Sequence, residues 1–461
     1  MGGGAPPLAE GRCREATEGR HTSVALLLLA TACVTHSLDY TGLACDDAHP
    51  CPVGLTCGAD KTCGGGSNGG GDGGTSTDAG CPFDLDPAAS ACSGTTWYLS
   101  PAGNDSADGK SVTTAKATLT GVTVSPGDVV HLLGGTWPTT PAITAAMSGS
   151  SACPVLFDGE SDGGTVLVHT LHLDATFAVL RHLTFTPKDE DAINAGGAKN
   201  VTFQFDTFRA QMPTPGQYPS DLFLPGDGCK DCVVRQCRFE SDGTNTVLSE
   251  AQTPSAFSFY GNTVVMKGAS LSFVGPALVE ANDFSGHFSA QQNSGLLDFT
   301  KAPNSVVRRN VFHDIDDIFD SPMIWKAGRV TNNTFVRISG NDTAPLVIGA
   351  GRFDDNIASI TGWVVKESEA DGGDYNLFDP SVGRPFGSFD GGALNGTDQL
   401  AAVGFDPSGY VPAAGNAAVD RGDPSLPVPL GGGTRADIGA FERGATPIAD
   451  GRYCLPDGGN P

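Results

Sequence analysis

The sequence lacks any run of about 20 apolar residues, the length that a membrane-spanning helix requires. It is also poor in basic residues: 27 Lys and Arg stand against 52 Asp and Glu, which gives a formal net charge of −25. A surface of that sign repels nucleic acid and anionic lipid headgroups, and it repels acidic polysaccharides except at a local basic patch or through cations. We therefore expect no nucleic-acid partner.

Helical periodicity is also missing, because apolar residues do not recur at i, i+3 and i+4 in the main body of the chain. Glycine (63 residues) and proline (31 residues) are abundant, which indicates many turns and argues against long helices. Hydrophobic residues still make up 39% of the chain, enough to build a continuous core. The composition therefore favours an all-β fold.

The main body carries a repeat in which a residue that is usually Asn is followed two places later by one that is usually Phe. The first positions are Leu183, Asp206, Cys237, Asn262, Asn282, Asn310, Asn333, Asn356 and Asn376. Their partners are Phe185, Phe208, Phe239, Val264, Phe284, Phe312, Phe335, Ala358 and Phe378. Successive copies are 20 to 31 residues apart and average about 24.

This spacing predicts a solenoid of stacked coils, each with three short strands and three turns. Neighbouring coils would lie about 4.8 Å apart, the distance between paired strands. The Asn of each coil can then bond to the Asn above and below it, because an amide carries both a donor and an acceptor. The Phe faces inward and stacks on the Phe of the next coil. A β-sandwich or a propeller is the alternative, and the regular spacing disfavours both.

Several segments resemble the coils of pectin-lyase-like β-helix proteins: "NVTFQFDTF", "DCVVRQCRF", "SVVRRNVF" and "GRVTNNTFV". Upstream, "WYLSPAGNDSADGKSVTTAKATL" is similar to their N-terminal segment. Downstream, "AAVDRGDP" and "RADIGAFE" resemble the closing segment of bacterial β-helix surface proteins, called a choice-of-anchor domain. The resemblance covers roughly residues 96–444 and implies an all-β, right-handed parallel β-helix of about ten coils. It says little of activity, because this scaffold hosts lyases, hydrolases, epimerases and non-catalytic adhesins.

Residues 1–33 have the layout of a signal peptide: basic residues, the apolar run 24–30, and small residues before Cys33. This end resembles a bacterial lipobox, which implies that Cys33 is lipidated and becomes the first residue of the mature chain. The absence of Asp after Cys33 favours the outer membrane by the same analogy. An ordinary cleaved signal is the alternative. We expect an outer-membrane lipoprotein that faces the cell surface, or a secreted protein, with membrane contact through the lipid alone.

The 13 cysteines, many at short spacings, fit an oxidising compartment. The evenly spaced Cys45, Cys51, Cys57 and Cys63 predict two disulfides in a small module that resembles Cys-rich modules of myxobacterial secreted proteins; three connectivities fit, and a zinc site is the rival. Farther on, we expect Cys81 and Cys92 to fasten the start of the β-helix and Cys229 and Cys232 to form a local disulfide. Cys237, which replaces a ladder Asn, is predicted to be a buried free thiol.

Outward-facing strand positions are the first candidates for chemistry. Aligning "GLLDFT", "MIWKAG", "LVIGAG" and "WVVKES" places Asp298, Lys326, Gly349 and Lys366 in one outward column. The positions expected to face inward are Leu297, Phe299, Met323, Trp325, Leu346, Ile348, Trp363 and Val365.

Lyases of the resembled family use a Lys or Arg to remove the proton α to a uronate carboxylate, helped by calcium. The resemblance implies that Lys326 is the catalytic base and that Asp298 and Lys366 bind substrate. The alternative is a solvated column of cross-coil ion pairs, each of which contributes little.

Acidic clusters are the second candidates. Asp189 and Asp191 precede Asp227 by roughly one coil, and stacked carboxylates could supply the oxygen ligands of calcium. Ordinary turn chemistry explains the same residues, because turns favour Asp. The acidic run "HDIDDIFD" (residues 313–320) is expected in a long loop, where a His and paired carboxylates could carry out inverting glycoside hydrolysis. The remaining motifs of such hydrolases are missing.

The domain boundaries expected from these features are a signal peptide (1–33), a Cys-rich module (34–63), a Gly-rich linker (64–80), an N-terminal cap (81–137), the parallel β-helix (138–395) and a closing segment (396–461). The first hypothesis for function is an exported, monomeric cell-surface β-helix that binds glycans or serves as a rigid adhesive module. The alternative is a calcium-assisted polysaccharide lyase that cleaves acidic polysaccharide by β-elimination.

Overall fold

The computed structural model describes the chain in part. The described residues are 56–57, 63–64, 92–209, 229–240, 256–267, 271–273, 275–287, 296–318, 322–340, 346–366, 373–386, 394, 396–407, 409–426, 428–429 and 431–445. The chain divides into two compact units, Met1–Ser76 and Thr77–Pro461. In the first unit, β1 (Thr56–Cys57) pairs with β2 (Cys63–Gly64) in antiparallel fashion, which brings the backbones of Cys57 and Cys63 into register.

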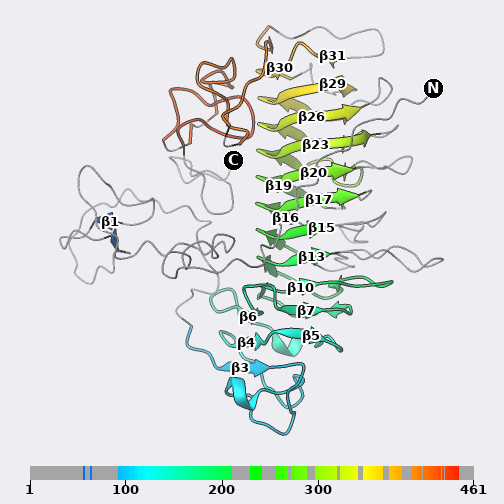
Figure 1. Ribbon diagram of the computed structural model, residues 1–461, viewed down its shortest axis with the longest axis vertical. Helices are drawn as coiled ribbons and strands as arrows, with labels where there is room; N and C mark the ends of the chain where they lie inside the picture. Colours follow the sequence, from blue (N-terminus) through cyan, green and yellow to red (C-terminus); the bar gives the residue numbers. More distant parts are fainter. Residues whose placement is uncertain are drawn as a thin grey trace, which may run out of the picture. The chain divides into compact units, whose positions relative to one another are not determined.

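The second unit is a stack of parallel strands, drawn as the column of arrows in Figure 1. Its first sheet has eleven strands among the described residues, each paired with the strand one coil away. They are β3 (Thr96–Leu99), β4 (Val129–Leu132), β6 (Val155–Asp158), β9 (Ala178–Arg181), β12 (Thr202–Gln204), β14 (Cys232–Arg235), β16 (Phe257–Tyr260), β19 (Ala277–Glu280), β22 (Val306–Arg308), β25 (Arg329–Thr331) and β28 (Arg352–Asp354).

The second sheet follows the first around the coil and is also parallel throughout the described residues. Its strands are β5 (Gly135–Trp137), β7 (Thr165–Leu167), β10 (Thr184–Phe185), β13 (Thr207–Arg209), β15 (Arg238–Glu240), β17 (Thr263–Lys267), β20 (Asp283–His287), β23 (Val311–Ile318), β26 (Thr334–Gly340), β29 (Ile357–Lys366), β30 (Leu377–Phe378) and β32 (Gln399–Leu400).

The third sheet closes the coil and consists mostly of very short strands. They are β18 (Leu271–Ser272), β21 (Leu297–Asp298), β24 (Ile324–Trp325), β27 (Val347–Ile348) and β31 (Val382–Phe386). In earlier coils, β8 (Leu171–His172) and β11 (Ile193–Asn194) pair with each other as a separate two-stranded parallel sheet. The long strand β29 takes part in two sheets, because its first half pairs with β26 and its end pairs with β27. Stacked parallel sheets of this kind are typical of the right-handed β-helix that the sequence predicts.

Helices play almost no part in the portion of the chain that the structure describes. They are two 3-10 turns, η2 (Val112–Thr114) and η3 (Ala145–Met147). No described helix is long and apolar enough to cross a membrane.

The predicted ladder positions stack in register through the second sheet. The nine partner positions from Phe185 to Phe378 form one continuous column of paired residues. The rings of Phe284 and Phe312 lie 4.8 Å apart and nearly parallel, and Phe312 and Phe335 lie 4.9 Å apart. The ring of Phe312 is completely buried. The Asn/Phe repeat is therefore confirmed as the core of the solenoid.

The described part of the closing segment, which ends at residue 445, lies beside the last coils (Figure 1, orange and red). Its Ala418 and Ile438 pack with Ile357 and Leu377 of the helix in a small core of their own. Gly439 approaches β26 and β29 so closely that a Cβ atom there would lie 2.6 Å from Ile357 and 2.9 Å from Thr334. With φ at 103°, this position requires glycine.

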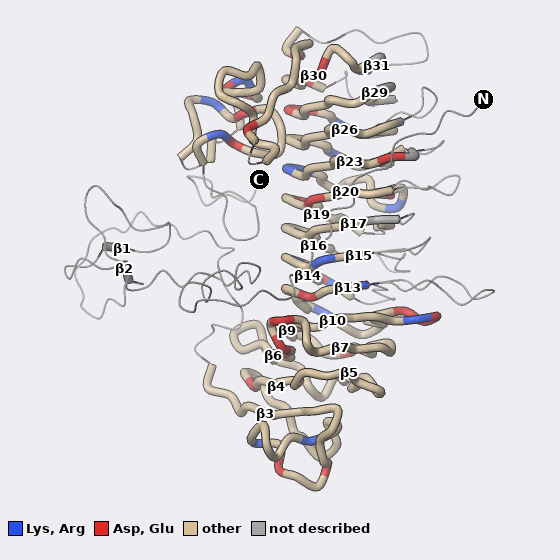
Figure 2. Tube along the Cα trace, viewed as in Figure 1, with Lys and Arg blue, Asp and Glu red and all other residues tan. Residues whose placement is uncertain are grey.

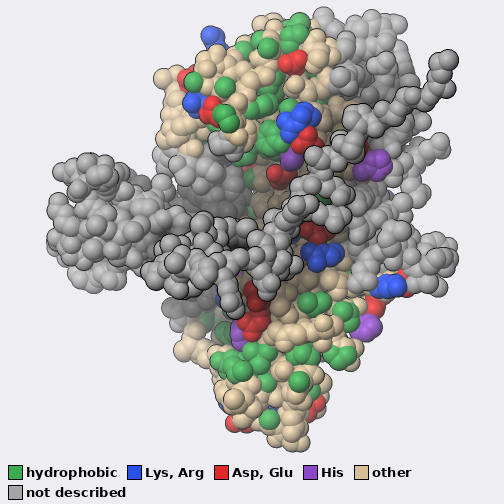
Figure 3. All heavy atoms as spheres, viewed as in Figure 1, with side chains coloured by type: hydrophobic (Ala, Val, Ile, Leu, Met, Phe, Trp, Pro, Cys, Tyr) green, Lys and Arg blue, Asp and Glu red, His purple; other side chains and the backbone are tan. Residues whose placement is uncertain are grey.

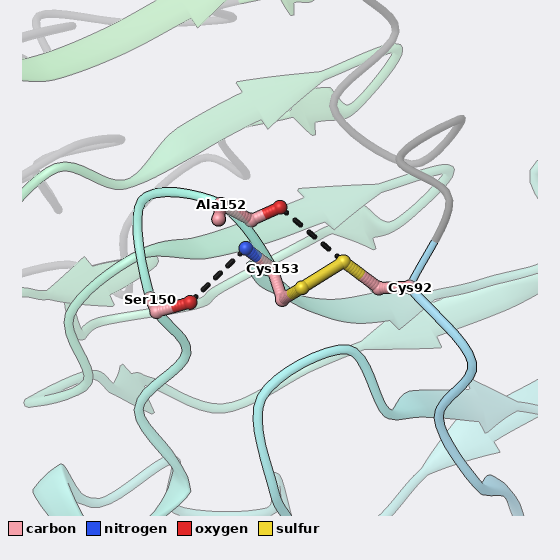
Figure 4. Close-up of a disulfide and its surroundings, with 4 residues drawn as sticks. All are labelled: Cys92, Ser150, Ala152 and Cys153. Atoms are coloured by element: carbon pink, nitrogen blue, oxygen red, sulfur yellow. Dashed lines mark hydrogen bonds between the residues drawn. A yellow bond between two sulfur atoms is a disulfide. The ribbon is translucent and has the colours of Figure 1, made fainter.

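The described disulfides agree with the prediction. Cys92 bonds to Cys153, with Cα atoms 5.8 Å apart, and thus fastens the start of the β-helix; the sequence did not name this partner (Figure 4). The bond links the chain before β3 to the turn before β6, two coils farther on. Cys229 and Cys232 form the predicted local disulfide, and Cys237 is a buried free thiol as predicted. Cys33, Cys45, Cys51 and Cys81 lie outside the described residues.

Candidate functional site

The strand pairing of the third sheet fixes which side chains share its outer surface. Asp298 pairs with Trp325, Trp325 with Ile348, and Ile348 with Lys366. Ser272 precedes Asp298 in the same column. The neighbouring column, which runs through Leu297, Ile324, Val347 and Val365, is almost completely buried and faces the core.

In two coils, the residue predicted to face outward therefore lies one position too late in the sequence. Trp325 and Ile348, expected inside, are only half-buried, and they replace Lys326 and Gly349 between Asp298 and Lys366. Lys326 and Gly349 instead occupy the turn after the strand, with φ at 60° and 65°. The side chain of Lys326 is exposed there. Lys366 holds its column position by backbone pairing, and nothing is described of its side chain.

We call Asp298, Trp325, Lys326 and Ile348 the Trp325 face. The ammonium nitrogen of Lys326 lies 6.0 Å from the centroid of the Trp325 ring. The indole N–H of Trp325 is buried and has no hydrogen-bond partner among the described residues, although such groups usually find one. One Asp298 oxygen accepts a 2.9 Å bond from the backbone N–H of Thr300. The face thus combines an aromatic surface with one carboxylate and one ammonium.

Two of the three residues predicted to bind a metal are described, and they are not part of a metal-binding cluster. Asp189 is exposed with φ at 59°, and Asp191 is half-buried. Glu190, which lies between them, bonds to a ring nitrogen of His169 at 2.6 Å and accepts a 3.0 Å bond from the hydroxyl of Thr170. Asp227 lies outside the described residues. No group of three potential ligands that could hold a metal occurs within the described ranges.

The acidic run after Phe312 is a strand and not the expected loop: Val311–Ile318 form β23. The pairing of β23 with its neighbours shifts register near Asp314, which has φ at 50°. Arg337 occupies the corresponding irregularity in β26, with φ at 51°. These stacked bulges direct charged side chains outward from an otherwise regular sheet.

A polar network surrounds the bulges. His313 bonds through one ring nitrogen to Asp283 at 2.8 Å and through the other to Asp314 at 2.7 Å. Arg337 donates two bonds to Asp314, at 2.5 and 2.6 Å, and one of 2.9 Å to the hydroxyl of Tyr410 in the closing segment. Basic, acidic and histidine side chains lie together beneath the closing segment in Figure 3.

The network shifts the ionisation of its members. The hydrogen bond with Asp283 and the carboxylate of Asp314 raise the pKa of His313, and the hydrogen bonds from Arg337 hold the pKa of Asp314 well below its usual range. The charged side chains of the network therefore supply one another's hydrogen-bond partners and opposite charges. This arrangement fits the attachment of the closing segment through Tyr410 better than acid–base work on a substrate. Elsewhere, basic and acidic positions are mixed along the stack in Figure 2.

Comparison with known proteins assigns neither a family nor an activity to this chain. No protein-family model matches the chain, and no curated protein matches it by sequence. Among solved structures, the pectate lyase Pel9A is 16% identical, with 77% of this chain and 98% of that chain covered and a TM-score of 0.43. A GH136 lacto-N-biosidase from Eubacterium ramulus is 12% identical, with 67% and 68% covered and a TM-score of 0.41.

A third solved structure is a mannuronic-acid-specific family 6 polysaccharide lyase from human gut microbiota. It is 15% identical to this chain, with 67% of this chain and 82% of that chain covered and a TM-score of 0.37. Likenesses at this level assign neither substrate nor reaction to this chain. The parallel β-helix architecture rests on its own strand pairing.

Proposed function

We propose that the protein binds a polysaccharide on the outer surface of its third sheet, at the Trp325 face. The observation that carries the proposal is the outward position of Trp325 between Asp298 and Ile348. An indole ring presents a large apolar surface against which the C–H face of a sugar ring can lie. The carboxylate of Asp298 can accept bonds from sugar hydroxyls, and the ammonium of Lys326 can donate them.

An extended ligand suits this face because the coils repeat the same surface about every 4.8 Å. A chain molecule that lies across the coils would contact Ser272, Asp298, Trp325 and Ile348 in turn. The basic group beside the ring also matters, because the protein as a whole carries a charge of −25 and would otherwise repel an acidic glycan.

Export to the cell surface is part of the proposal and rests on the sequence alone. The signal-like segment and Cys33 support it, and a glycan-binding β-helix needs such a location to meet its ligand.

A panel experiment tests the binding proposal. The purified full-length protein is run by electrophoresis through gels that contain neutral or uronate-rich polysaccharides, with and without calcium. We expect retardation in at least one gel and none in gels without polysaccharide. Unchanged mobility across the whole panel would rule the proposal out.

A polysaccharide lyase is the second candidate, and the position of the Lys326 ammonium 6.0 Å from the Trp325 ring favours it. In such a reaction a neutral lysine would remove the proton α to a uronate carboxylate. The electron pair would form a C=C bond, and the glycosidic oxygen would leave.

Lys326→Ala tests this assignment on any uronate polysaccharide that yields unsaturated product, followed by ultraviolet absorbance. The lyase candidate predicts at least a hundredfold loss of rate, in the range expected when a general base is removed. Lys188→Ala removes another exposed lysine and should leave the rate unchanged. If product forms and Lys326→Ala keeps full activity, Lys326 is not the base.

A further inference from the structure

A pocket lies between the first sheet and the closing segment, away from the Trp325 face. Its floor includes Arg308 at the end of β22, Arg309 directly after that strand, and Arg329 of β25. Its opposite wall is formed by the closing segment, with Leu426 and Pro429 among the apolar residues. The closing segment thus converts one stretch of sheet into a concave site.

The floor of this pocket brings together the guanidinium groups of Arg308, Arg309 and Arg329. The buried carboxylate of Glu280 is shared by Arg308 at 2.9 Å and Arg309 at 3.4 Å. In the next column, the buried carboxylate of Asp354 is 2.9 Å from Arg352 and 3.8 Å from Arg329. Each of these two carboxylates is therefore shared between two guanidinium groups.

Two of these guanidinium groups retain unused donors. The Nε atoms of Arg308 and Arg329 are buried and have no hydrogen-bond partner among the described residues. Arg308 as a whole is only 8% exposed, so water reaches it poorly. Buried donors of a charged group are costly when unsatisfied, and a carboxylate is the acceptor that matches a guanidinium best.

The acidic residues of the pocket wall are directed elsewhere. Glu442 accepts a 2.8 Å bond from the backbone N–H of Asp437. Asp437 accepts bonds of 2.7 Å from the backbone N–H groups of Asp420 and Arg443. These bonds hold the closing segment together. Burial also raises the pKa of Glu442 to about 7, so this carboxyl opposes an anionic ligand only in part.

We propose that this pocket binds the carboxylate of a single sugar acid, with the carboxylate on the arginines and the sugar ring against the apolar wall. The site stands apart from the polysaccharide-binding face and does not depend on it. An inorganic oxyanion would match the arginines but gain nothing from Leu426 and Pro429. A neutral sugar would gain the wall but leave the arginine donors unsatisfied.

Titration calorimetry on the full-length protein tests the site with D-galacturonate, D-galactose and inorganic phosphate as probes. We expect saturable binding of galacturonate, at least about tenfold tighter than either of the other two, the difference that one charge-assisted bond supplies. No binding of galacturonate, or equal binding of galactose, would overturn the proposal. Binding of phosphate as tight as that of galacturonate would reduce the pocket to a general anion site and also overturn it.

Four variants test whether galacturonate binds in this pocket. Arg329→Gln should weaken galacturonate binding about tenfold or more, because Arg329 lines the pocket. The side chain of Arg329 is partly exposed, so this substitution carries a small risk of misfolding. Arg352→Gln is the matched control: it also contacts Asp354, but it does not line the pocket. Leu426→Asp leaves every arginine in place and should abolish binding by repulsion. Trp325→Ala should leave it unchanged, which separates this site from the polysaccharide face. Full binding by Arg329→Gln and Leu426→Asp would contradict the proposal.

Discussion

The buried asparagines of the ladder each use both ends of the side-chain amide. The Oδ1 atom of Asn310 accepts from the backbone N–H and the side-chain amide of Asn282, while its own amide donates to Asn333 at 3.0 Å. The series ends at Asp398, whose carboxylate accepts two bonds from Asn376. Because a buried amide must satisfy donor and acceptor together, the repeat tolerates few other residues.

Asp206 occupies a buried ladder position that is Asn in most coils. One of its oxygens accepts a 2.8 Å bond from the backbone N–H of Leu183, and the other has no hydrogen-bond partner among the described residues. Burial raises the pKa of Asp206 well above its usual value. The protonated carboxyl of Asp206 therefore contributes its full stabilisation at pH values below the pKa that this residue has in the unfolded chain. This contribution is lost as the pH rises through the pKa of Asp206 in the folded protein.

Asp206→Asn should therefore stabilise the protein at neutral and alkaline pH, by about 1 kcal/mol or more, because the amide is neutral and can donate as the ladder asparagines do. Urea unfolding at pH 5 and pH 8 measures the effect, and the gain should be larger at pH 8. A variant that is less stable than the native protein at pH 8 would refute this account of Asp206.

Single residues also mark the limit of sequence reasoning. The Asn and Phe positions were predictable because each residue type has one environment that suits it, repeated coil after coil. Trp325 was not, because three apolar residues in succession, Met323 to Trp325, give no alternation from which to read the inner face. The positive φ of Lys326, which ends the strand, leaves no signal in a lysine.

At the scale of the elements, the length of the strands determined which strand registers could be predicted from the sequence. The second sheet has strands of up to ten residues with a Phe in most coils, so one alignment satisfies all of them. The strands of the third sheet are mostly two residues long, and a period of two cannot be established over two residues. The partner of Cys92 was equally hidden, because Cys153 lies 61 residues away and only the stacking brings them together.

The closing segment is an element whose attachment should depend on pH. Asp355 of the helix accepts a 2.6 Å bond from the backbone N–H of Asp423, and burial raises its pKa to about 8. Burial likewise raises the pKa of Glu442 to about 7. Both carboxyls have a higher pKa in the folded protein than in the unfolded chain, where the pKa is near 4. They therefore stabilise the fold fully at pH values below about 4, and this contribution is lost as the pH rises through about 7 to 8.

Limited proteolysis at pH 6 and pH 9 checks this prediction, with cleavage in the closing segment faster at pH 9. Asp355→Asn removes one titrating group and should make the two rates more alike. Equal rates in the native protein at both pH values would show that these carboxyls do not control the attachment.

At the scale of the whole molecule, the sequence predicts a lipid anchor at Cys33, joined to the β-helix through a Cys-rich module and a glycine-rich linker. Cys33→Ala should move the expressed protein from the membrane fraction to the soluble fraction, because a covalently attached lipid would no longer be present. Cell fractionation and immunoblotting measure the distribution. If the variant and the native protein fractionate alike, the chain is not anchored through Cys33.

The proposed function also belongs to the scale of the whole molecule, because we propose a solenoid that presents the Trp325 face to a polysaccharide. Its most direct test is the affinity of Trp325→Ala for the polysaccharide that retards the native protein most. We predict that Trp325→Ala binds at least about tenfold more weakly, a loss of about 1.4 kcal/mol, and that Trp325→Phe keeps most of the affinity. Phe205→Ala removes an aromatic residue that is 43% exposed beside the first sheet and should bind as the native protein does. Native affinity in Trp325→Ala would contradict the account.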